Sequence, residues 1–185
     1  MSQISYKLEI VRELMQGRIH IRGLASRLRI NAMMISRKMN ELVKENVVDF
    51  MAEGKNKSFF LKDTIEAREN CYLSEKYALL MTLEKYPNLR KLIDRIQKDN
   101  RIKLALLFGS YAKGIAKKDS DIDIFIETEN TEIKKEYNLI DSKLSVKIGN
   151  LNKDNLLVKE IEKNHIIIKG VEDYYGKSGI FGKAP

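Results

Sequence analysis

Residues 104–126 read LALLFGSYAKGIAKKDSDIDIFI, and this stretch decides the fold of the second half of the chain. The apolar run that ends at residue 108 has the length and composition of a strand buried on both faces. A Gly-Ser turn and a basic loop follow it, and the next segment begins with the alternation DIDI. Because side chains two residues apart in a strand point to the same face, Asp121 and Asp123 are predicted to project together, while the isoleucines between them enter the core.

The paired carboxylates have two interpretations, one structural and one chemical. They are either surface acids at a strand edge or ligands of a divalent cation, since Mg²⁺ favours one or two protein carboxylates together with substrate phosphates. Gly109 has no Cβ to keep a phosphate from the backbone, and Ser110 adds a hydroxyl donor. Lys113, with the lysines that follow it, supplies positive charge. These residues suit a nucleoside triphosphate bound with Mg²⁺.

A Gly-Ser pair, ten residues and then Asp-x-Asp resembles the signature of the nucleotidyltransferase fold of the DNA polymerase β superfamily, in particular the minimal nucleotidyltransferases. The resemblance covers roughly residues 100–170. It implies a mixed sheet flanked by helices, with NTP, expected to be ATP, and Mg²⁺ as the cofactors. It also implies that Gly109, Ser110 and Lys113 bind the nucleotide. Asp121 and Asp123 become the metal ligands and catalytic residues.

The sequence departs from this pattern on the next predicted strand, residues 144–150. The resemblance implies a third acid there, and Lys147 occupies the expected position. A lysine cannot ligate Mg²⁺, so it either binds phosphate or pairs with an aspartate in place of the metal. Two functions therefore stay open. The domain is an active transferase whose third group comes from elsewhere, or it binds nucleotide without efficient turnover and acts as a sensor.

The first third of the chain has the pattern of three helices followed by a hairpin. Residues 5–16 place apolar side chains on one helical face, and Gly17 ends that helix. A short second helix leads to a turn in which Asn31 is predicted to cap a third helix. Two β-prone runs then flank a hairpin tip at residues 53–56.

This layout resembles the winged helix-turn-helix regulators of archaea and bacteria, over HIRGLASRLRINAMMISRKMNELVKENVVDFMAEGKNKSFFLK, residues 20–62. The resemblance implies that the third helix enters the major groove of double-stranded DNA and that the wing holds adjacent phosphates. Arg37 is expected to contact either a guanine edge or a phosphate. A winged helix that binds another protein through Met33-Met34 is the alternative. The candidate DNA-binding residues are Met33, Ser36, Arg37, Lys38, Asn40, Lys55 and Lys57.

The charge distribution favours the DNA-binding interpretation. The chain carries 34 Lys and Arg against 26 Asp and Glu, a formal net charge of +8. Residues 1–62 hold 12 of these basic residues and 6 of the acidic ones, so the remaining 123 residues are nearly balanced. A basic first third is typical of a module that faces nucleic acid.

The fold class expected is α+β, in four segments. Residues 1–62 form the winged helix-turn-helix, residues 63–99 a helical connector, residues 100–176 the nucleotidyltransferase-like domain and residues 177–185 a mobile tail. Apolar side chains along the connector either form a homodimer seam or pack against a neighbouring domain. A homodimer would suit a winged-helix protein, since these proteins usually read two half-sites.

The composition argues against a membrane-spanning, secreted or disulfide-linked protein. No apolar run approaches the roughly 18 residues that cross a bilayer, and the start of the chain has no signal-peptide core. Cys71 is alone, so an intramolecular disulfide is excluded. We therefore expect a cytoplasmic protein with no membrane partner. No second His or Cys lies near His20 or His165 in the sequence, so both histidines are expected to be structural. The resemblance to minimal nucleotidyltransferases suggests a protein partner as well, such as a toxin modified by its antitoxin.

Overall fold

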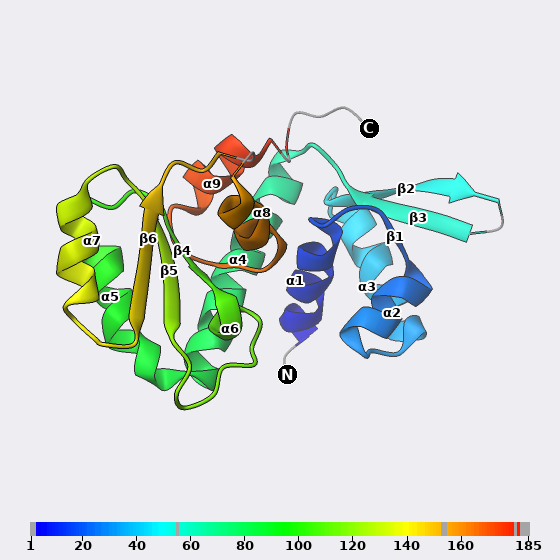
Figure 1. Cartoon of the computed structure of the whole chain (residues 1–185). Helices are drawn as coiled ribbons and strands as arrows, with labels where there is room; N and C mark the ends of the chain where they lie inside the picture. Colours follow the sequence, from blue (N-terminus) through cyan, green and yellow to red (C-terminus); the bar gives the residue numbers. More distant parts are fainter. Residues whose placement is uncertain (1–2, 55, 153–154, 180, 182–185) are drawn as a thin grey trace. The chain divides into compact units, whose positions relative to one another are not determined.

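The computed structural model describes residues 3–54, 56–152, 155–179 and 181. The chain divides into two compact units, Met1–Tyr77 with Gly179–Pro185, and Ala78–Ser178. The boundary lies inside helix α4 (Ile65–Lys85), so the connector expected at residues 63–99 is shared between the two units and is not a segment of its own. Each unit has its own hydrophobic core, and Figure 1 shows the elements that form them.

The first unit has the element order of a winged helix-turn-helix, as predicted. Its three-stranded antiparallel sheet has the order β1-β3-β2, and the β2–β3 hairpin is the wing. The two-residue strand β1 was not predicted. The elements before α4 are α1 (Gln3–Leu14), β1 (Ile19–His20), α2 (Ile21–Leu28), α3 (Ala32–Lys44), β2 (Val48–Glu53) and β3 (Asn56–Leu61).

The turn between α2 and α3 follows from local chemistry. Arg29 adopts the left-handed conformation, with φ of 55°, and ends α2. The side chain of Asn31 accepts a hydrogen bond of 2.7 Å from the backbone N–H of Met33, which confirms it as the N-cap of α3. The cap satisfies one of the N–H groups that a helix start leaves without an intrahelical partner.

The core of the first unit lies between its helices and the sheet. Phe59 of β3 is buried and pairs in register with Ile19 of β1. Apolar burial of this kind is the main stabilising contribution to a small unit. Phe181, in the tail expected to be mobile, packs against this core, and the guanidinium of Arg68 lies 5.6 Å from the centre of its ring. Lys177 and Ser178, the first residues of the predicted tail, are instead the last residues of helix α9 (Val171–Ser178). Residues 180 and 182–185 lie outside the described residues.

The second unit is built on a four-stranded mixed sheet of order β6-β5-β4-β7. Strand β5 pairs with β6 in parallel and with β4 in antiparallel, and β4 pairs with β7 in antiparallel. This is the mixed sheet that the sequence predicted. After the end of α4, the elements are η1 (Pro87–Leu89), α5 (Arg90–Lys98), β4 (Ala105–Phe108), α6 (Gly109–Ala112), β5 (Ile122–Glu127), α7 (Thr131–Asn138), β6 (Leu144–Gly149), α8 (Leu156–Lys163), β7 (Ile166–Lys169) and α9 (Val171–Ser178).

The two faces of this sheet are covered by different helices. Ile122, Ile124 and Ile126 of β5 are buried in one core cluster with apolar side chains of α5 and α7, as the alternation predicted. Helices α8 and α9 lie on the other side of the sheet (Figure 1). Phe125 points to that side and is also buried, so the polar groups that β5 leaves there, Asp123 and Glu127, lie on either side of it.

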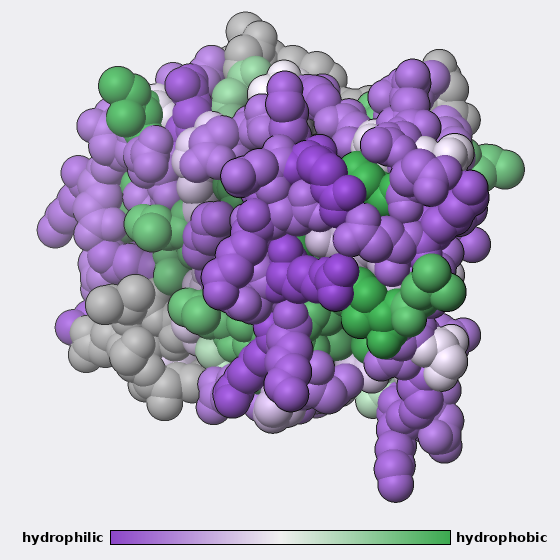
Figure 2. Space-filling model, turned by 90° about the vertical axis from the view of Figure 1, so that its left-hand side faces the viewer, coloured by the Kyte–Doolittle hydropathy of each residue, from purple (hydrophilic) through white to green (hydrophobic). Residues whose placement is uncertain are grey.

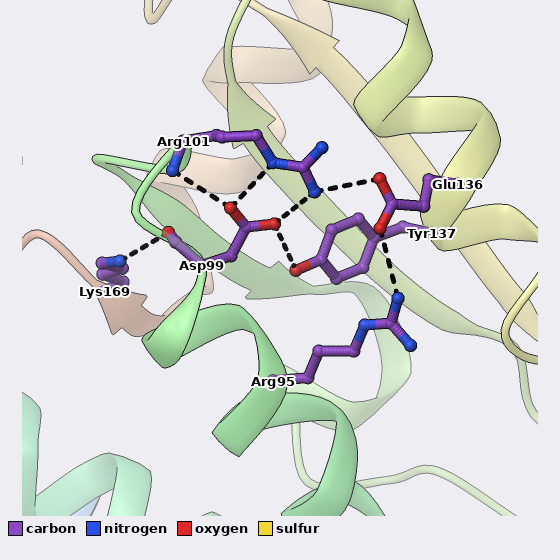
Figure 3. Close-up of polar contacts among 6 residues, drawn as sticks. All are labelled: Arg95, Asp99, Arg101, Glu136, Tyr137 and Lys169. Carbon is purple, nitrogen blue, oxygen red and sulfur yellow. Dashed lines mark hydrogen bonds and ion pairs between the residues drawn. The ribbon is translucent and has the colours of Figure 1, made fainter.

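A network of polar groups connects the end of α5 with α7; its members, drawn in Figure 3, are Arg95, Asp99, Arg101, Glu136, Tyr137 and Lys169. Asp99 accepts hydrogen bonds from Arg101 at 2.7 Å and from the hydroxyl of Tyr137 at 3.1 Å. The Arg101 guanidinium holds the pKa of Asp99 well below its usual range. Burial, with the hydrogen bond to Asp99, raises the pKa of Tyr137 to about 12. The network therefore keeps an ionised carboxylate paired at the edge of the core.

The exterior is largely hydrophilic. In the face shown in Figure 2, hydrophilic residues predominate and hydrophobic ones form smaller patches between them. Leu73 and Leu80 of α4 are exposed, which leaves the expected homodimer seam a prediction. The described residues include no helix with the length and apolar character needed to span a membrane.

Candidate functional site

The candidate nucleotide site lies at the end of β4, where Gly109 begins the short helix α6. Gly109 has φ of +68°, in the left-handed region that favours glycine. The preceding residue, Phe108, pairs in register with Asp123 of β5. A Cβ built on Gly109 would collide with the carboxylate of Asp123. Glycine is therefore required here for two reasons, its backbone conformation and the close approach of the backbone to Asp123.

The two aspartates are positioned by the start of β5. Asp121 is exposed and immediately precedes the strand, whereas Asp123 is half-buried within it. Burial raises the pKa of the Asp123 carboxyl, and the negative charge of Asp121 raises it further. A hydrogen bond with Ser145 and the positive charge of Lys147 act in the opposite direction. A cation bound beside Asp123 would therefore offset the free-energy cost of keeping this carboxylate ionised.

The basic loop after α6 is fixed by contacts from other elements. Lys113 Nζ lies 3.6 Å from a carboxylate oxygen of Glu160 in α8. Lys85 Nζ donates to the carbonyl oxygen of Gly114 at 2.7 Å, which anchors the loop to α4. Glu160 also acts on the pKa of Asp123, which it raises. Lys113 is therefore paired with an acid that the sequence did not reveal, and its contact with nucleotide stays a prediction.

Strand β6, which pairs with β5 beside the aspartates, is aligned differently from the prediction. The residue level with Asp123 is two positions before Lys147, on the same face of the strand. In the parallel pair β5–β6, Asp123 is in register with Ser145, and Lys147 is in register with Phe125. The place of the expected third acid is therefore taken by Ser145, and Lys147 is the next residue on the same face. Neither is an acid, so the conclusion that β6 supplies no third carboxylate is unchanged. Within the described residues, no ion pair joins Lys147 to either aspartate.

The donors at this site fit a hard divalent cation bound together with phosphates. Asp121 and Asp123 supply carboxylate oxygens, and the absence of a Cβ at Gly109 lets the Asp123 carboxylate lie directly against the backbone. Mg²⁺ commonly takes one or two protein carboxylates and completes its shell with phosphate oxygens and water. Across the part of the chain that the structure describes, no group of three or more His, Cys, Asp and Glu side chains could hold a metal ion. Two carboxylates alone would leave most positions around such an ion to phosphate oxygens and water.

The outer face of α3 carries most of the candidate DNA-binding side chains. Met33 is 81% exposed, the Arg37 side chain is 69% exposed, and Asn40 is also exposed. Ser36 is half-buried. Lys38 is the exception, because its side chain is only 4% exposed and donates to both carboxylate oxygens of Glu41 at 3.0 and 3.1 Å. Lys38, expected to contribute positive charge to DNA binding, is therefore buried on the inner face of α3.

A groove of about 800 Å³ separates the start of α3 from the wing. Met33, Ser36 and Lys57, all proposed from the sequence, line it together. Arg18 and Arg22 add positive charge from the segment around β1 and the start of α2. Lys57 also places its ammonium group 3.7 Å from the centre of the Phe50 ring. Lys55 lies outside the described residues.

Both histidines have structural contacts, in line with the sequence. The Nδ1 atom of His20 lies 2.9 Å from the carbonyl oxygen of Lys57, and its Nε2 atom lies 3.2 Å from Glu53, so His20 connects β1 with the wing. His165 is buried, and its Nδ1 atom lies 2.9 Å from the carbonyl oxygen of Ile161.

Residues 90–173 match the model of a protein family described as "Polymerase beta, Nucleotidyltransferase". This segment begins at α5 and includes Gly109, both aspartates and Ser145; it is just under half of the chain. Among solved structures, the adhesin competence repressor AdcR of Streptococcus pyogenes matches with 17% identity and a TM-score of 0.39. That match covers 49% of this chain and 66% of AdcR, which is less than two thirds of the AdcR chain. The search of curated proteins found no match. The second unit is therefore similar to nucleotidyltransferase domains of the polymerase β type.

Proposed function

We propose that the protein is a DNA-binding regulator whose second unit binds a nucleoside triphosphate with Mg²⁺ and transfers its nucleotide to a hydroxyl group. The observation that supports this most is the fit of Gly109 against Asp123. A glycine with a positive φ, whose Cβ would meet a half-buried carboxylate, has a role beyond ending a strand. Because the backbone of Gly109 lies so close to this carboxylate, a phosphate that shares a cation with Asp123 would also lie close to that backbone.

Each residue of the site has a distinct task in this proposal. Gly109 and Ser110 bind the β- and γ-phosphates, and Lys113 moves from Glu160 to the polyphosphate when nucleotide binds. Asp121 and Asp123 would hold Mg²⁺, which would neutralise phosphate charge and make the α-phosphorus a better electrophile. The acceptor oxygen attacks that phosphorus, the bond between the α- and β-phosphoryl groups breaks, pyrophosphate leaves, and the hydroxyl proton passes to water.

We expect the acceptor to be a hydroxyl of a partner protein, with ATP as the nucleotide. This follows from the resemblance to minimal nucleotidyltransferases, including antitoxins that modify their toxin. In such a system the winged unit would repress the operon that encodes both proteins. Identification of a labelled partner, co-purified with the chain, tests this part of the proposal.

The experiment for nucleotide transfer uses triphosphates labelled at the α-phosphate. The protein and its co-purified partners are incubated with each of the four labelled NTPs and Mg²⁺, and transfer appears as a labelled protein band. Asp121→Asn is expected to abolish the label. Asp119→Asn is the matched control, since Asp119 is two residues away, 94% exposed and paired with Lys143 at 3.7 Å. Equal loss in both variants would contradict a specific role for Asp121.

A second candidate function, nucleotide sensing without turnover, is favoured by the residues on β6. Ser145 lies in register with Asp123 where the resemblance implies an acid, and a hydroxyl is a poor base. A sensor would bind NTP and Mg²⁺ with an affinity that Asp121→Asn weakens, yet give no labelled product with any of the four nucleotides. A change in DNA affinity on nucleotide binding would then identify what the sensor controls.

For the first unit, we propose double-stranded DNA as the partner of α3 and the wing. The exposed face of α3, the groove beside it and the basic side chains of Arg18, Arg22 and Lys57 support this proposal. Phosphate contacts make such binding steeply salt-dependent. Fluorescence anisotropy with DNA from the region upstream of the gene, measured over a range of salt concentrations, tests it. We expect a homodimer on two half-sites, which sedimentation of the complex would reveal.

A further inference from the structure

The face of the second unit that carries the aspartates has an unusual arrangement of charge. Asp121 and Asp123 project from β5, while β6 places Ser145 and Lys147 on the same face, in register with Asp123 and Phe125. Lys147 is exposed, and Ser145 is half-buried. The strand next to the two carboxylates therefore contributes a hydroxyl and an ammonium group, with no further negative charge.

The acids available to this site are correspondingly few. Among the described residues, no three acidic or other ligating side chains come close enough to hold one ion. Glu160 of α8 is the further acid whose charge raises the pKa of Asp123, but it is paired with Lys113 at 3.6 Å and belongs to another element. Two carboxylates satisfy one divalent cation with phosphate and water as its other ligands. A second cation would lack protein ligands and would be repelled by the ammonium group of Lys147.

We propose that this site takes a single divalent cation with its nucleotide, and that Lys147 supplies fixed positive charge beside Asp123, in the role that a second cation has in two-metal sites. The inference rests on the proposed nucleotide binding of the second unit and extends it to the number of ions. The side chain is suited to this task because an ammonium group is a compact charge with three donors on a flexible stem. When NTP binds, those donors are available to phosphate oxygens on the β6 side of the site.

The position of Lys147 agrees with this assignment. Ser145 is in register with Asp123, and Lys147 follows it by two residues on the same face of β6, so its ammonium group and the Asp123 carboxylate share one side of the sheet. Replacing Lys147 with an acid would reverse the local charge and would place a third carboxylate on the face shared by Asp121, Asp123 and Ser145.

The test counts ions and does not depend on turnover. Full-length protein is titrated with Mn²⁺ in the presence of a saturating, non-hydrolysable ATP analogue, and free Mn²⁺ is followed by electron paramagnetic resonance. We expect one bound ion in the wild type and two in Lys147→Glu. Lys135→Glu is the control, since Lys135 is exposed on α7, which packs against the opposite face of the sheet, and it should still bind one.

A second variant isolates the ammonium group. Lys147→Met keeps the stem of the side chain and removes its charge, so it should still bind one ion but should weaken binding of the analogue by about tenfold, the loss expected for a charge-assisted contact. Because Lys147 is exposed, both variants are expected to fold, and the circular dichroism spectrum of each should match that of the wild type. Unchanged analogue affinity in Lys147→Met would overturn the role of the lysine.

The remaining outcomes separate this inference from the proposed function. Two ions in the wild type would overturn the single-ion site, and a fall to one in Glu160→Gln would then identify Glu160 as the missing ligand. No bound ion and no bound analogue in the wild type would contradict the nucleotide site as a whole, and this inference with it.

Discussion

In the first unit, the side chains proposed to contact DNA extend from the surface, whereas in the second unit the proposed nucleotide site is formed by backbone and half-buried groups. Arg37 is largely exposed and lies 3.7 Å from Glu41, its neighbour one helical turn away. Gly109, by contrast, has its backbone directly against Asp123, and strand pairing fixes what lies on either side of that carboxylate.

The difference predicts how each site responds to mutation. A surface that binds phosphates through several exposed Lys and Arg side chains loses a modest amount of affinity with each substitution, because each contact contributes separately. A site in which one backbone segment must approach one carboxylate fails when that approach is blocked. Four substitutions test this contrast, and they follow here in order of decreasing effect.

Gly109→Ala should have the largest effect, namely loss of nucleotide binding. Alanine at a positive φ costs about 1–2 kcal/mol, and its Cβ would also collide with the Asp123 carboxylate. Gly114→Ala is the matched control. Its φ is +70°, but the nearest atom to a Cβ there is Lys85 Nζ at 3.6 Å. Calorimetric titration with an ATP analogue and Mg²⁺ should show binding by Gly114→Ala only. If both variants bind equally well, the close approach at Gly109 has no role in the nucleotide site.

Asp99→Asn should destabilise the second unit by about 1–3 kcal/mol, since Arg101 and Tyr137 would lose a charged partner. Asp94→Asn should change stability by about 0.3–0.5 kcal/mol, because Asp94 forms only an exposed i,i+4 pair with Lys98. Hydrogen exchange of peptides from β4 and α7 measures both. A similar small effect in the two variants would show that the network in Figure 3 is dispensable.

The same network predicts an acid limit for the second unit. Because Arg101 holds the folded-state pKa of Asp99 below that of the unfolded chain, about 3.9, its stabilising contribution is complete above that pH. The contribution is lost as the pH falls from about 4 through the folded-state pKa. Urea denaturation between pH 3 and 7, in steps of about one unit, should show a smaller acid loss in Asp99→Asn than in the wild type.

Arg37→Ala should weaken DNA binding by about 1–3 kcal/mol if the side chain reads a base edge, and the loss should depend on the sequence at one position. Lys44→Ala is the charge-matched control, at the exposed last turn of the same helix. Fluorescence anisotropy at fixed salt gives both affinities. A loss in Arg37→Ala that is the same for every DNA sequence would instead assign Arg37 to a phosphate.

Asn31→Ala should have the smallest effect, a loss of about 1 kcal/mol in the stability of the first unit. The variant removes the acceptor for the Met33 N–H at the start of α3 and leaves the outer face of the helix unchanged. Hydrogen exchange of peptides from α3 should report this loss, with DNA affinity at low temperature nearly unaltered. A large loss of affinity would mean that the helix start itself contacts DNA.

Local patterns predicted much of the fold. Asn31 before an apolar period, and Gly109 after a buried run, each carry a conformational preference that does not depend on distant residues. The helical spacing of the apolar residues in α3 could also have predicted the burial of Lys38. It lies three residues after Ile35 and four before Leu42, on the inner face of α3, yet its charge suggested a part in DNA binding. Its pairing with Glu41 makes the buried position tolerable.

What the sequence did not show depends on register and on packing between distant elements. Ser145 and Lys147 lie on the same face of β6, so a shift of two residues preserves every inward and outward side chain. The hydrophobic pattern therefore fits either residue beside Asp123, and pairing decides for Ser145. Glu160 reaches the site only because α8 folds over that side of the sheet, and no local signal marks it.

The contact between Phe181 and the core of the first unit makes that unit discontinuous in sequence. The second unit, Ala78–Ser178, is an insertion between two segments of the first. A truncation after residue 178 would therefore spare the transferase fold and loosen the winged helix, so that DNA affinity, not nucleotide affinity, would report the damage. Purification tags attached beyond Phe181 carry the same risk for assays of DNA binding.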